Sequence, residues 1–318
     1  MKENGGEFRG MFLQLGNNMW SDVPVKDWAL TKKENLADVS SLDVLRFDEA
    51  VWRRLTDRMV ARGFNAVVMD LGEGCVYPSH PELSVKGSWD VEKMRKELAR
   101  LRGMGLEPIP KLNFSTAHDT WLKEYGRMVS TPEYYKVCAD VIRDVCEIFD
   151  HPRLFHLGYD EETAGNQNKY ADCVVRQGEL WWHDFNFFVQ TVEKLGMRPW
   201  IWSDFLWRHK DEFLKRMPKS VIQSNWYYRQ WFDLETIPKE RKAHLESFLT
   251  LEKAGFDQIP CGSNWACDEN IAGLVRFCRK HIAPERLKGF LMTTWGATMP
   301  NHEAELTKGI DLAAAAWT

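Results

Sequence analysis

The chain has 318 residues, of which 44% are hydrophobic and 28% charged, and its formal net charge is -4. This composition provides enough apolar residues for a large core, which excludes an intrinsically disordered protein. Its 42 basic and 46 acidic residues form no basic stripe, which argues against nucleic acid as a partner. No apolar run reaches the roughly 20 residues of a membrane span, so we expect no membrane partner.

The cysteines and the N-terminus bear on the cellular compartment. The seven cysteines are odd in number and contain no Cys-x-x-Cys pair. Most lie in apolar segments, which predicts free buried thiols and neither a disulfide scaffold nor a structural zinc site. The first residues lack the apolar core of a signal peptide. We therefore expect a cytoplasmic location for the chain as written, and a periplasmic or secreted one if a signal has been removed. The oligomeric state is left open.

Short apolar or β-branched segments alternate with longer amphipathic segments, and this alternation predicts parallel strands joined by helices. Eight strands are predicted, at 10–15, 66–70, 107–113, 154–158, 199–204, 221–226, 259–265 and 289–295. Helices with apolar residues at three and four spacing are predicted near 47–62, 90–104, 132–149, 179–195, 210–217, 240–254, 268–281 and 303–316.

Glycines mark the ends of four of these helices, at Gly63, Gly105, Gly196 and Gly255. Eight strand–helix pairs are the number that closes a (β/α)8 barrel, or TIM barrel. We therefore predict an α/β protein with a single barrel domain spanning residues 1–318. The long segments 21–46, 72–88 and 162–178 follow strands one, two and four, and should lie at the barrel mouth, where such barrels build their sites.

Polar and aromatic residues follow most of the predicted strands. Tryptophan is frequent among them, and its flat apolar face suits the C–H groups of a sugar. The mouth is therefore predicted to bind a saccharide, although each tryptophan could instead fill the upper layer of the barrel. The predicted substrate-binding residues are His118, His156, Trp202, Asp204, Asn225, Trp226, Tyr227, Tyr228, Trp265 and Trp295.

Two adjacent carboxyls, Asp160 and Glu161, follow the fourth predicted strand. Side chains alternate in direction along a strand, so the two are expected to do different jobs. If they lie close together, repulsion and partial burial raise one pKa and keep that carboxyl protonated near neutral pH. The alternative is a solvated acidic loop or a helix N-terminus, where acidic residues are common.

The segment from His156 to Glu161, His-Leu-Gly-Tyr-Asp-Glu, resembles the His-x-Gly-Gly-Asp-Glu motif of family 20 glycoside hydrolases, the β-N-acetylhexosaminidases. The segments 9–14 and 105–110 are similar to the first and third strands of that family. The resemblance implies a catalytic barrel with Glu161 as general acid and base. It also implies that Asp160 orients the 2-acetamido group of the sugar, which attacks the anomeric carbon in place of an enzyme nucleophile.

The same resemblance covers the rest of the barrel thinly and with departures. His118 falls near the family's Pro-Gly-His, and Trp202, Tyr227 or Tyr228, and Trp295 fall near its sugar-binding aromatics. The family's hydroxyl-gripping Arg after strand one is replaced by the segment 16–18, its Glu and Asp after strand three by Lys111 and Asn113, and its second motif glycine by Tyr159. These departures imply that the barrel and the acid are kept while the sugar, or the need for its N-acetyl group, differs.

We therefore expect a glycosidase that cleaves a terminal amino sugar or a related glycoside, without cofactor or metal. Three alternatives stay open. One is a retaining glycosidase whose nucleophile is Asp204, Asp268 or Glu269, with about 5–5.5 Å between the two carboxyls. Another is a glycan-binding barrel that has lost catalysis. The third is a metal-dependent hydrolase that uses His118 and His156, although neither His-x-His nor His-Glu-x-x-His spacing occurs.

Overall fold

The computed structural model describes residues 6–22 and 39–317, and this part of the chain forms one barrel. The strands are β1 (Phe8–Gln14), β2 (Ala66–Asp70), β3 (Glu107–Lys111), β4 (Leu154–His156), β5 (Arg198–Trp202), β6 (Ile222–Ser224), β7 (Cys261–Ser263) and β8 (Gly289–Thr293). They pair in parallel in the order β6-β5-β4-β3-β2-β1-β8-β7. Parallel bridges from Gln223 to Gln258 and from Trp226 to Cys261 join β6 to β7 and complete the ring.

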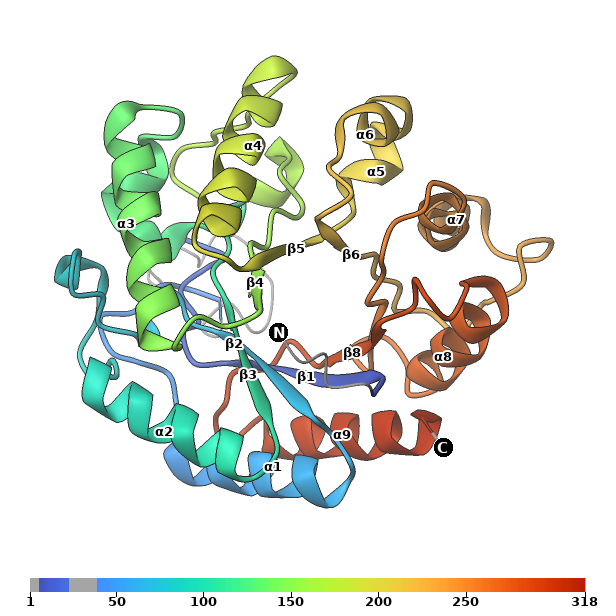
Figure 1. The fold of residues 1–318 in the computed structure, drawn as a ribbon, viewed down its shortest axis with the longest axis horizontal. Helices are drawn as coiled ribbons and strands as arrows, with labels where there is room; N and C mark the ends of the chain where they lie inside the picture. Colours follow the sequence, from blue (N-terminus) through green and yellow to red (C-terminus); the bar gives the residue numbers. More distant parts are fainter. Residues whose placement is uncertain (1–5, 23–38, 318) are drawn as a thin grey trace.

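Helices surround the strands, as Figure 1 shows. They are α1 (Glu49–Ala61), α2 (Val91–Gly103), α3 (Pro132–Ile148), α4 (Glu179–Lys194), α5 (Phe205–Arg208), α6 (Lys210–Arg216), α7 (Lys239–Lys253), α8 (Asn270–His281) and α9 (Glu303–Trp317). Short 3-10 helices are η3 (Gly72–Gly74), η4 (Pro81–Leu83), η5 (Thr120–Arg127) and η6 (Ala164–Gln167). The predicted (β/α)8 barrel is confirmed. Helix α5 was not predicted, because four residues are too few for a helical period.

Local sequence explains where the long helices begin. Asp48, Asp90 and Thr131 precede α1, α2 and α3, and each side chain accepts a hydrogen bond from a backbone N–H in the first turn. Such caps satisfy donors that the helix itself leaves unpaired.

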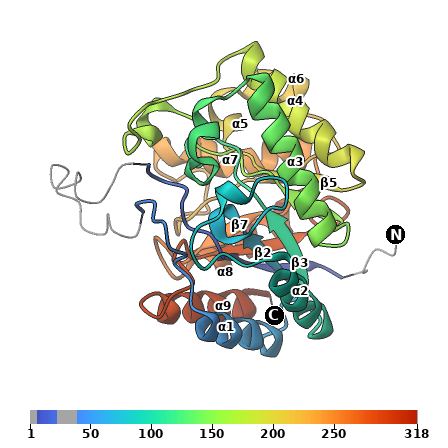
Figure 2. The same ribbon diagram turned by 90° about the vertical axis from the view of Figure 1, so that its left-hand side faces the viewer.

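In Figure 2, α3 and α4 lie side by side. Among the described residues, no helix is long and apolar enough to cross a membrane.

The apolar core has two parts, because side chains alternate along each strand. One part fills the barrel interior and contains Phe12, Val68, Ile109, Trp200 and Leu291, among others. The other part packs the outer faces of the strands against the helices. The same alternation turns four larger polar or aromatic side chains into the upper interior, namely Asp70, Lys111, His156 and Trp202. This layer forms the floor below the barrel mouth.

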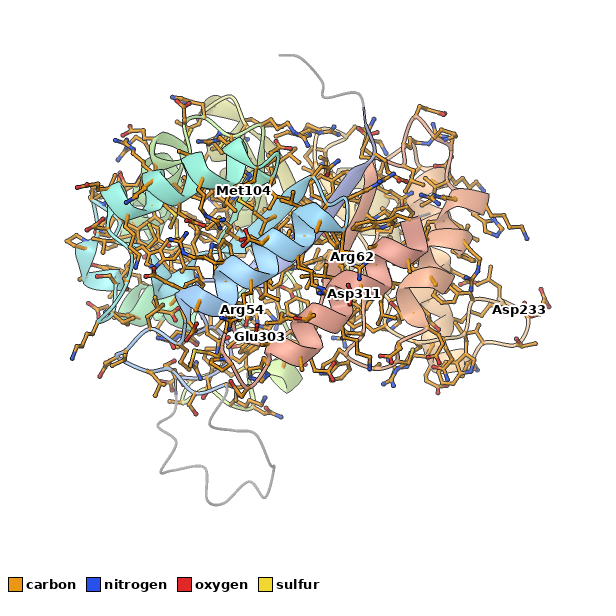
Figure 3. The ribbon with its side chains drawn as sticks, turned by 90° about the horizontal axis from the view of Figure 1, so that it is seen from below. Arg54, Arg62, Met104, Asp233, Glu303 and Asp311 are labelled. Carbon is orange, nitrogen blue, oxygen red and sulfur yellow. The ribbon has the colours of Figure 1, made fainter. Side chains whose placement is uncertain are left out.

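Ion pairs join neighbouring helices at the surface. Helices α1 and α9 lie next to each other in Figure 3, where Arg54 contacts Glu303 and Arg62 contacts Asp311. The Arg54 guanidinium donates two hydrogen bonds to Glu303, of 2.6 and 2.8 Å. Arg54 is more than half exposed. Solvent screening limits what such a pair contributes to stability.

Loops after the first, second and fourth strands share one end of the barrel. The Tyr170 hydroxyl donates to the Met19 carbonyl, so the segments after β4 and β1 touch. Val44 forms a parallel bridge with Lys86, which joins the segments after β1 and β2. The described parts of the three predicted mouth segments therefore meet as expected. Residues 23–38 of the first segment lie outside the described part of the chain.

Candidate active site

A cavity of about 500 Å³ opens at the carboxyl ends of the strands. Its walls combine aromatic rings with two carboxyls and several cations. The lining residues are Asn17, Met19, Trp20, Val39, Asn113, His118, Asp160, Glu161, Lys169, Trp226, Tyr228, Arg229, Arg241, Trp265, Trp295, Ala297 and His302. Among the described residues that line it, Asp160 and Glu161 are the two carboxylates.

Asp160 and Glu161 both face His118. The Nε2 atom of His118 lies 3.5 Å from Asp160 Oδ2 and 3.4 Å from Glu161 Oε2. Asp160 Oδ1 also accepts a 2.8 Å hydrogen bond from the Asn113 amide. Asp160 is buried, whereas about a third of the Glu161 side chain is exposed to the cavity. Asp160 is therefore fixed, and Glu161 is accessible to a ligand.

The expected alternation of these two carboxyls is wrong, because β4 ends at His156 and the chain then leaves the extended conformation. Gly158, Tyr159 and Glu161 have φ angles of 69°, 72° and 56°. These left-handed conformations cost free energy in residues other than glycine. They turn Asp160 and Glu161 toward the same histidine, and Tyr159 adopts this conformation at the position where the resembled motif has its second glycine.

Gly158 cannot be replaced without moving Asn113. An alanine Cβ at residue 158 would lie 2.1 Å from Asn113 Oδ1 and 2.8 Å from its Cα. We expect Gly158→Ala to destabilise the fold by clearly more than the roughly 1–2 kcal/mol of left-handed strain, and to lower any activity that depends on Asp160. Urea denaturation measures the stability loss. Gly196→Ala is the matched control, since Gly196 has a φ of 81° and no atom within 4 Å of the new Cβ. Equal losses in both variants would contradict the steric argument.

His118 and the carboxyls shift one another's pKa values. Burial acts to lower the pKa of His118, but the charges of Asp160 and Glu161 outweigh burial and raise the pKa above its usual value. Burial acts to raise the pKa of Glu161, but the contact with His118 outweighs it and the net pKa is lowered. These opposite shifts favour a protonated His118 beside an ionised Glu161.

Asp204 lies behind Glu161 on the β5 side. Its Oδ2 accepts a 2.8 Å hydrogen bond from the Glu161 backbone N–H. It does not line the first cavity, but with Glu161 it lines a second one of about 510 Å³, formed by segments after β4 and β5. Burial, and then the negative charges of Asp160 and Glu161, raise the pKa of Asp204 to about 8. The raised carboxyl pKa expected in this region belongs to Asp204.

A pH-dependent loss of stability follows from the pKa of Asp204. The folded protein retains a proton up to about pH 8 that the unfolded chain releases near the ordinary value of 3.8. Because the folded state binds more protons in this interval, the free energy of unfolding falls as the pH rises through it. Asp204→Asn keeps an acceptor for Glu161 N–H but does not titrate. We expect the free energy of unfolding of the variant minus that of wild type, measured by urea denaturation, to increase from pH 5 to pH 8. A difference independent of pH would contradict this assignment.

Four predicted aromatic residues line the cavity, namely Trp226, Tyr228, Trp265 and Trp295. The Trp226 and Tyr228 rings stack with centroids 5.1 Å apart. Trp265 is 66% exposed, although large apolar side chains are usually covered. Trp295 lies half-buried over Phe12, with centroids 5.0 Å apart. Together they supply flat surfaces of the kind that a sugar ring packs against.

Four other predicted binding residues do not line the cavity. His156 and Trp202 are buried in the interior layer, where their rings lie 4.5 Å apart. The Asn225 amide donates to the His244 carbonyl and accepts from the Trp207 indole. The Tyr227 hydroxyl donates to the Trp231 carbonyl. None of the four side chains lines the first cavity, so these contacts position the floor and the segment after β6.

The other nucleophile candidates lie elsewhere. Asp268 forms an exposed ion pair with Lys308 at 2.7 Å. Neither Asp268 nor Glu269 lines either cavity beside Glu161. Of the three carboxyls predicted for this alternative, Asp204 alone lies next to Glu161.

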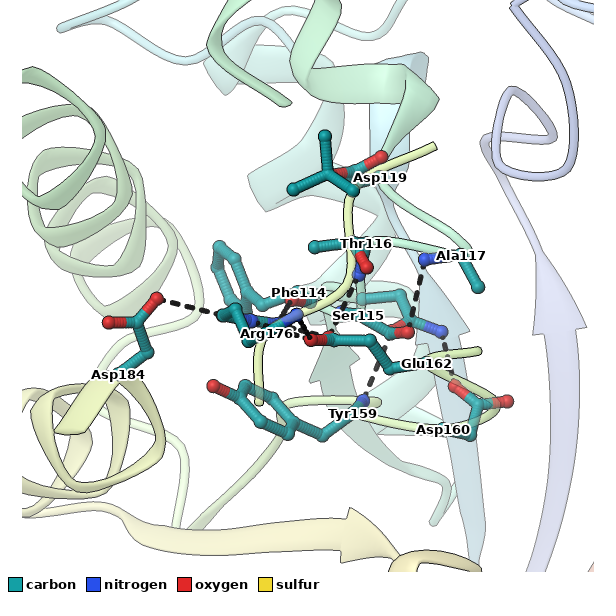
Figure 4. Close-up of polar contacts among 12 residues, drawn as sticks. Phe114, Ser115, Thr116, Ala117, Asp119, Tyr159, Asp160, Glu162, Arg176 and Asp184 are labelled. Atoms are coloured by element: carbon teal, nitrogen blue, oxygen red, sulfur yellow. Dashed lines mark hydrogen bonds and ion pairs between the residues drawn. The ribbon is translucent and has the colours of Figure 1, made fainter. Parts of the chain in front are cut away.

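A buried arginine that the sequence did not single out holds the segment after β4. Arg176 donates to both Glu162 carboxylate oxygens at 2.9 and 2.5 Å and to Asp184 at 3.2 Å. It also donates to the Phe114 carbonyl at 2.7 Å. Figure 4 shows Arg176 between Glu162 and Asp184. This network ties the residue after Glu161 to α4 and to the segment after β3.

A buried ion pair lies inside the barrel. Lys111 Nζ donates to Asp70 Oδ2 at 2.7 Å, and both side chains are almost completely buried. Burial raises the pKa of Asp70, against the charge of Lys111. The pair lies in the floor, so these two strand-end residues have a structural role.

His118, Asp160 and Glu161 could together hold a metal ion, since one ligand atom from each lies within 4.8 Å of the others. A histidine and two carboxylates are acceptable ligands for several divalent metals. Nothing else in the described part of the chain forms such a group of three.

The described chain is a (β/α)8 barrel with a cavity at the carboxyl ends of its strands. No family model and no curated protein matches the chain. Among solved structures, the β-N-acetylhexosaminidase from Bacteroides fragilis has a TM-score of 0.64 at 12% identity, over 98% of this chain and 65% of that one. A family 20 exo-β-N-acetylglucosaminidase from Vibrio harveyi, in complex with N-acetylglucosamine, has a TM-score of 0.62 at 15% identity, over 98% and 54%.

A family 5 glycoside hydrolase from Prevotella bryantii also matches, with a TM-score of 0.55 at 14% identity over 97% of this chain and 96% of that one. The chain spans about half the length of the Vibrio enzyme. At these identities the likeness shows the fold, and the expected resemblance to family 20 barrels is confirmed at that level. More than one glycoside hydrolase family shares the fold, so the mechanism depends on the site residues.

Proposed function

We propose that residues 1–318 form one catalytic domain that hydrolyses a 2-acetamido sugar glycoside with retention of configuration. Glu161 is the general acid and base, and Asp160 orients the acetamido group. The observation that carries this proposal is the pair Asp160 and Glu161, which supplies both carboxylates of an aromatic-walled cavity and converges on His118. The similar structures from Vibrio harveyi and Bacteroides fragilis are a β-N-acetylglucosaminidase and a β-N-acetylhexosaminidase, which agrees with this substrate class.

The different surroundings of the two carboxyls support different roles. Asp160 is buried and held by Asn113, which suits a group that fixes a substrate N–H in one orientation. Glu161 lines both cavities, so it can reach an oxygen that joins a sugar in one to a leaving group in the other. A general acid has to contact that glycosidic oxygen.

The proton for the leaving group starts on the His118–Glu161 pair. Burial lowers the pKa of His118, but the two carboxylates outweigh it and raise the pKa overall, which favours the proton on the imidazole. A bound sugar displaces water from the exposed part of Glu161, and such desolvation raises the pKa of a carboxyl. Glu161 then takes the proton from His118 and donates it to the glycosidic oxygen. In the second step the Glu161 carboxylate removes a proton from the attacking water.

The acetamido oxygen is the proposed nucleophile. Among the described residues, the first cavity offers no carboxylate besides Asp160 and Glu161. Asp204 lies behind Glu161 and holds its proton up to about pH 8, which makes it a poor nucleophile near neutral pH. The carbonyl oxygen of the sugar's own acetamido group, oriented by Asp160, fills this role without an enzyme nucleophile.

The test is turnover of a panel of aryl glycosides with and without a 2-acetamido group. We expect hydrolysis of the β-N-acetylglucosaminide or β-N-acetylgalactosaminide and none of the plain β-glucoside or β-galactoside. Turnover of the plain hexosides would replace the proposal by an enzyme nucleophile, with Asp204 as the candidate. Tight glycan binding without turnover would identify a binding protein.

Turnover measured in the presence of a chelator distinguishes the metal-dependent alternative from the proposed mechanism. In the proposed mechanism His118, Asp160 and Glu161 act without a metal, so EDTA leaves turnover unchanged. Loss of turnover in EDTA that added Zn²⁺ restores would instead assign these three residues to a metal site.

A further inference from the structure

Two arginines of the cavity wall have no carboxylate partner in the described part of the chain. Arg229 follows β6 and Arg241 lies in the first turn of α7, and both side chains are half-buried against the cavity. Within the described part of the chain, no carboxylate lies within ion-pair distance of either guanidinium. The half-buried Arg216 and Arg286 behave differently, since they pair with Glu179 and Glu252.

The free-energy cost of partly burying these two guanidinium groups without an anion indicates that this wall binds a ligand. Removing a guanidinium from water without a compensating anion is unfavourable. Neighbouring groups do not supply one. His244 also lines this wall, and burial together with the charges of Arg241 and Arg208 lowers its pKa to about 4, so it is neutral at pH 7. Two positive charges from separate elements therefore remain together at one wall, where an anionic ligand would relieve their repulsion.

The shape of the wall limits the size of that anion. Arg229 and Arg241 line both the first cavity and an adjoining chamber of about 50 Å³, whose other walls include Trp226, Tyr228, His244 and Trp265. A water-sized group needs about 10–15 Å³ of such space, so the chamber accepts a few oxygen-sized atoms. That is the size of a carboxylate or a sulfate group. The aromatic neighbours offer faces for the sugar ring that carries the group.

We propose that the glycan substrate is anionic, and that Arg229 and Arg241 bind a carboxylate or sulfate substituent of its sugar on the β6–β7 side of the mouth. This proposal rests on the proposed glycosidase function. Arginine presents a planar set of donors that matches carboxylate and sulfate oxygens in pairs. The two arginines act on specificity, because Asp160 and Glu161 carry the chemistry.

Turnover of matched substrates tests the proposal. The probes are a 4-nitrophenyl 2-acetamido-2-deoxy-β-glucoside, its 6-O-sulfate, and the corresponding uronic acid. We expect kcat/KM for one anionic probe to exceed that of the neutral probe by at least about ten-fold, the scale of a charge-assisted hydrogen bond. The preferred anionic probe identifies the substituent as sulfate or carboxylate.

Variants separate charge recognition from general binding. Arg229→Met and Arg241→Met are each expected to reduce the ratio of kcat/KM for the anionic probe to kcat/KM for the neutral probe to about one. Arg53→Met, an exposed arginine of α1 away from the mouth, is the matched control and should change neither value. Equal turnover of neutral and anionic probes by wild type, or equal losses on both in the arginine variants, would overturn the proposal.

A binding measurement keeps this test independent of catalysis. If no probe is hydrolysed, the proposed function fails, and calorimetric titration of Glu161→Gln with N-acetylglucosamine and with its 6-sulfate decides about the arginines. Tighter binding of the sulfated sugar that Arg229→Met abolishes and that salt weakens would support the anion site. Equal affinities for the two sugars would overturn it.

Discussion

Glu161→Gln is expected to lower kcat/KM for an aryl N-acetyl-β-hexosaminide by about 10²–10⁴-fold, the contribution of a positioned general acid. Glutamine keeps the shape of the side chain but cannot deliver a proton to the glycosidic oxygen. The fold should persist, because about a third of the Glu161 side chain is exposed to the cavity and its backbone N–H still donates to Asp204. Steady-state kinetics measure the loss, and urea denaturation checks that stability is unchanged.

Substrates with different leaving groups provide the control for this prediction. A dinitrophenolate leaves without protonation, whereas a methylumbelliferyl group benefits from it. We therefore expect the loss in Glu161→Gln to be large for the poorer leaving group and to shrink for the better one, because kcat/KM reports the first bond cleavage. The same loss for both leaving groups would show that Glu161 does not act as the proton donor.

Arg176→Met is expected to lower the free energy of unfolding by about 3–5 kcal/mol, the usual cost of leaving a buried charge without its partner. Arg176 is buried between Glu162 and Asp184, and its removal leaves both carboxylates inside the protein. The Phe114 carbonyl also loses its donor. The segment 162–178, which Figure 4 shows around this network, should then open first. Urea denaturation and native-state hydrogen exchange measure the two effects.

Arg54→Met is the matched control, because Arg54 also forms a bidentate pair with a glutamate but is more than half exposed (Figure 3). Its urea midpoint should stay close to that of wild type, since water replaces the lost contacts. If both variants unfolded at the same urea concentration, the buried network around Arg176 would not be the support of the segment after β4.

The fold was predictable because hydrophobic periodicity is repeated eight times along the chain. Strand β2 has the predicted bounds, and the eight predicted helices are found with ends shifted by at most two residues. Glycines such as Gly105, with a φ of 84°, end helices as predicted. Strand ends were less predictable. β4 stops at His156 because the left-handed residues that follow are set by contacts such as Gly158 against Asn113, which no local pattern reveals.

The site was predictable in its location and less so in its details. Trp226, Tyr228, Trp265 and Trp295 line the cavity, whereas His156 and Trp202 fill the floor. Strand alternation distinguishes these cases only once the position of each strand end is known, because a shift of one residue exchanges inside and outside. Arg229 directly follows the predicted binding residue Tyr228, but the absence of a carboxylate partner among the described residues depends on long-range packing that the sequence does not display.

Arg176 was missed for a related reason. It lies in a long segment without periodicity, and an arginine there is usually solvent-exposed. Its burial depends on Glu162 and on Asp184 of α4, eight residues further along. Buried ion pairs of this kind are assembled by the tertiary fold, so composition and spacing alone do not predict them.

The most direct test of the proposed mechanism uses aryl 2-acetamido-2-deoxy-β-glucosides whose acetyl group carries zero, one, two or three fluorine atoms. Fluorine withdraws electrons from the carbonyl oxygen and makes it a weaker nucleophile, while it changes the size of the acetyl group little. If the acetamido oxygen attacks the anomeric carbon, kcat/KM falls steeply with each fluorine. A value of kcat/KM that stays nearly constant across the series would contradict substrate assistance and would require an enzyme nucleophile such as Asp204.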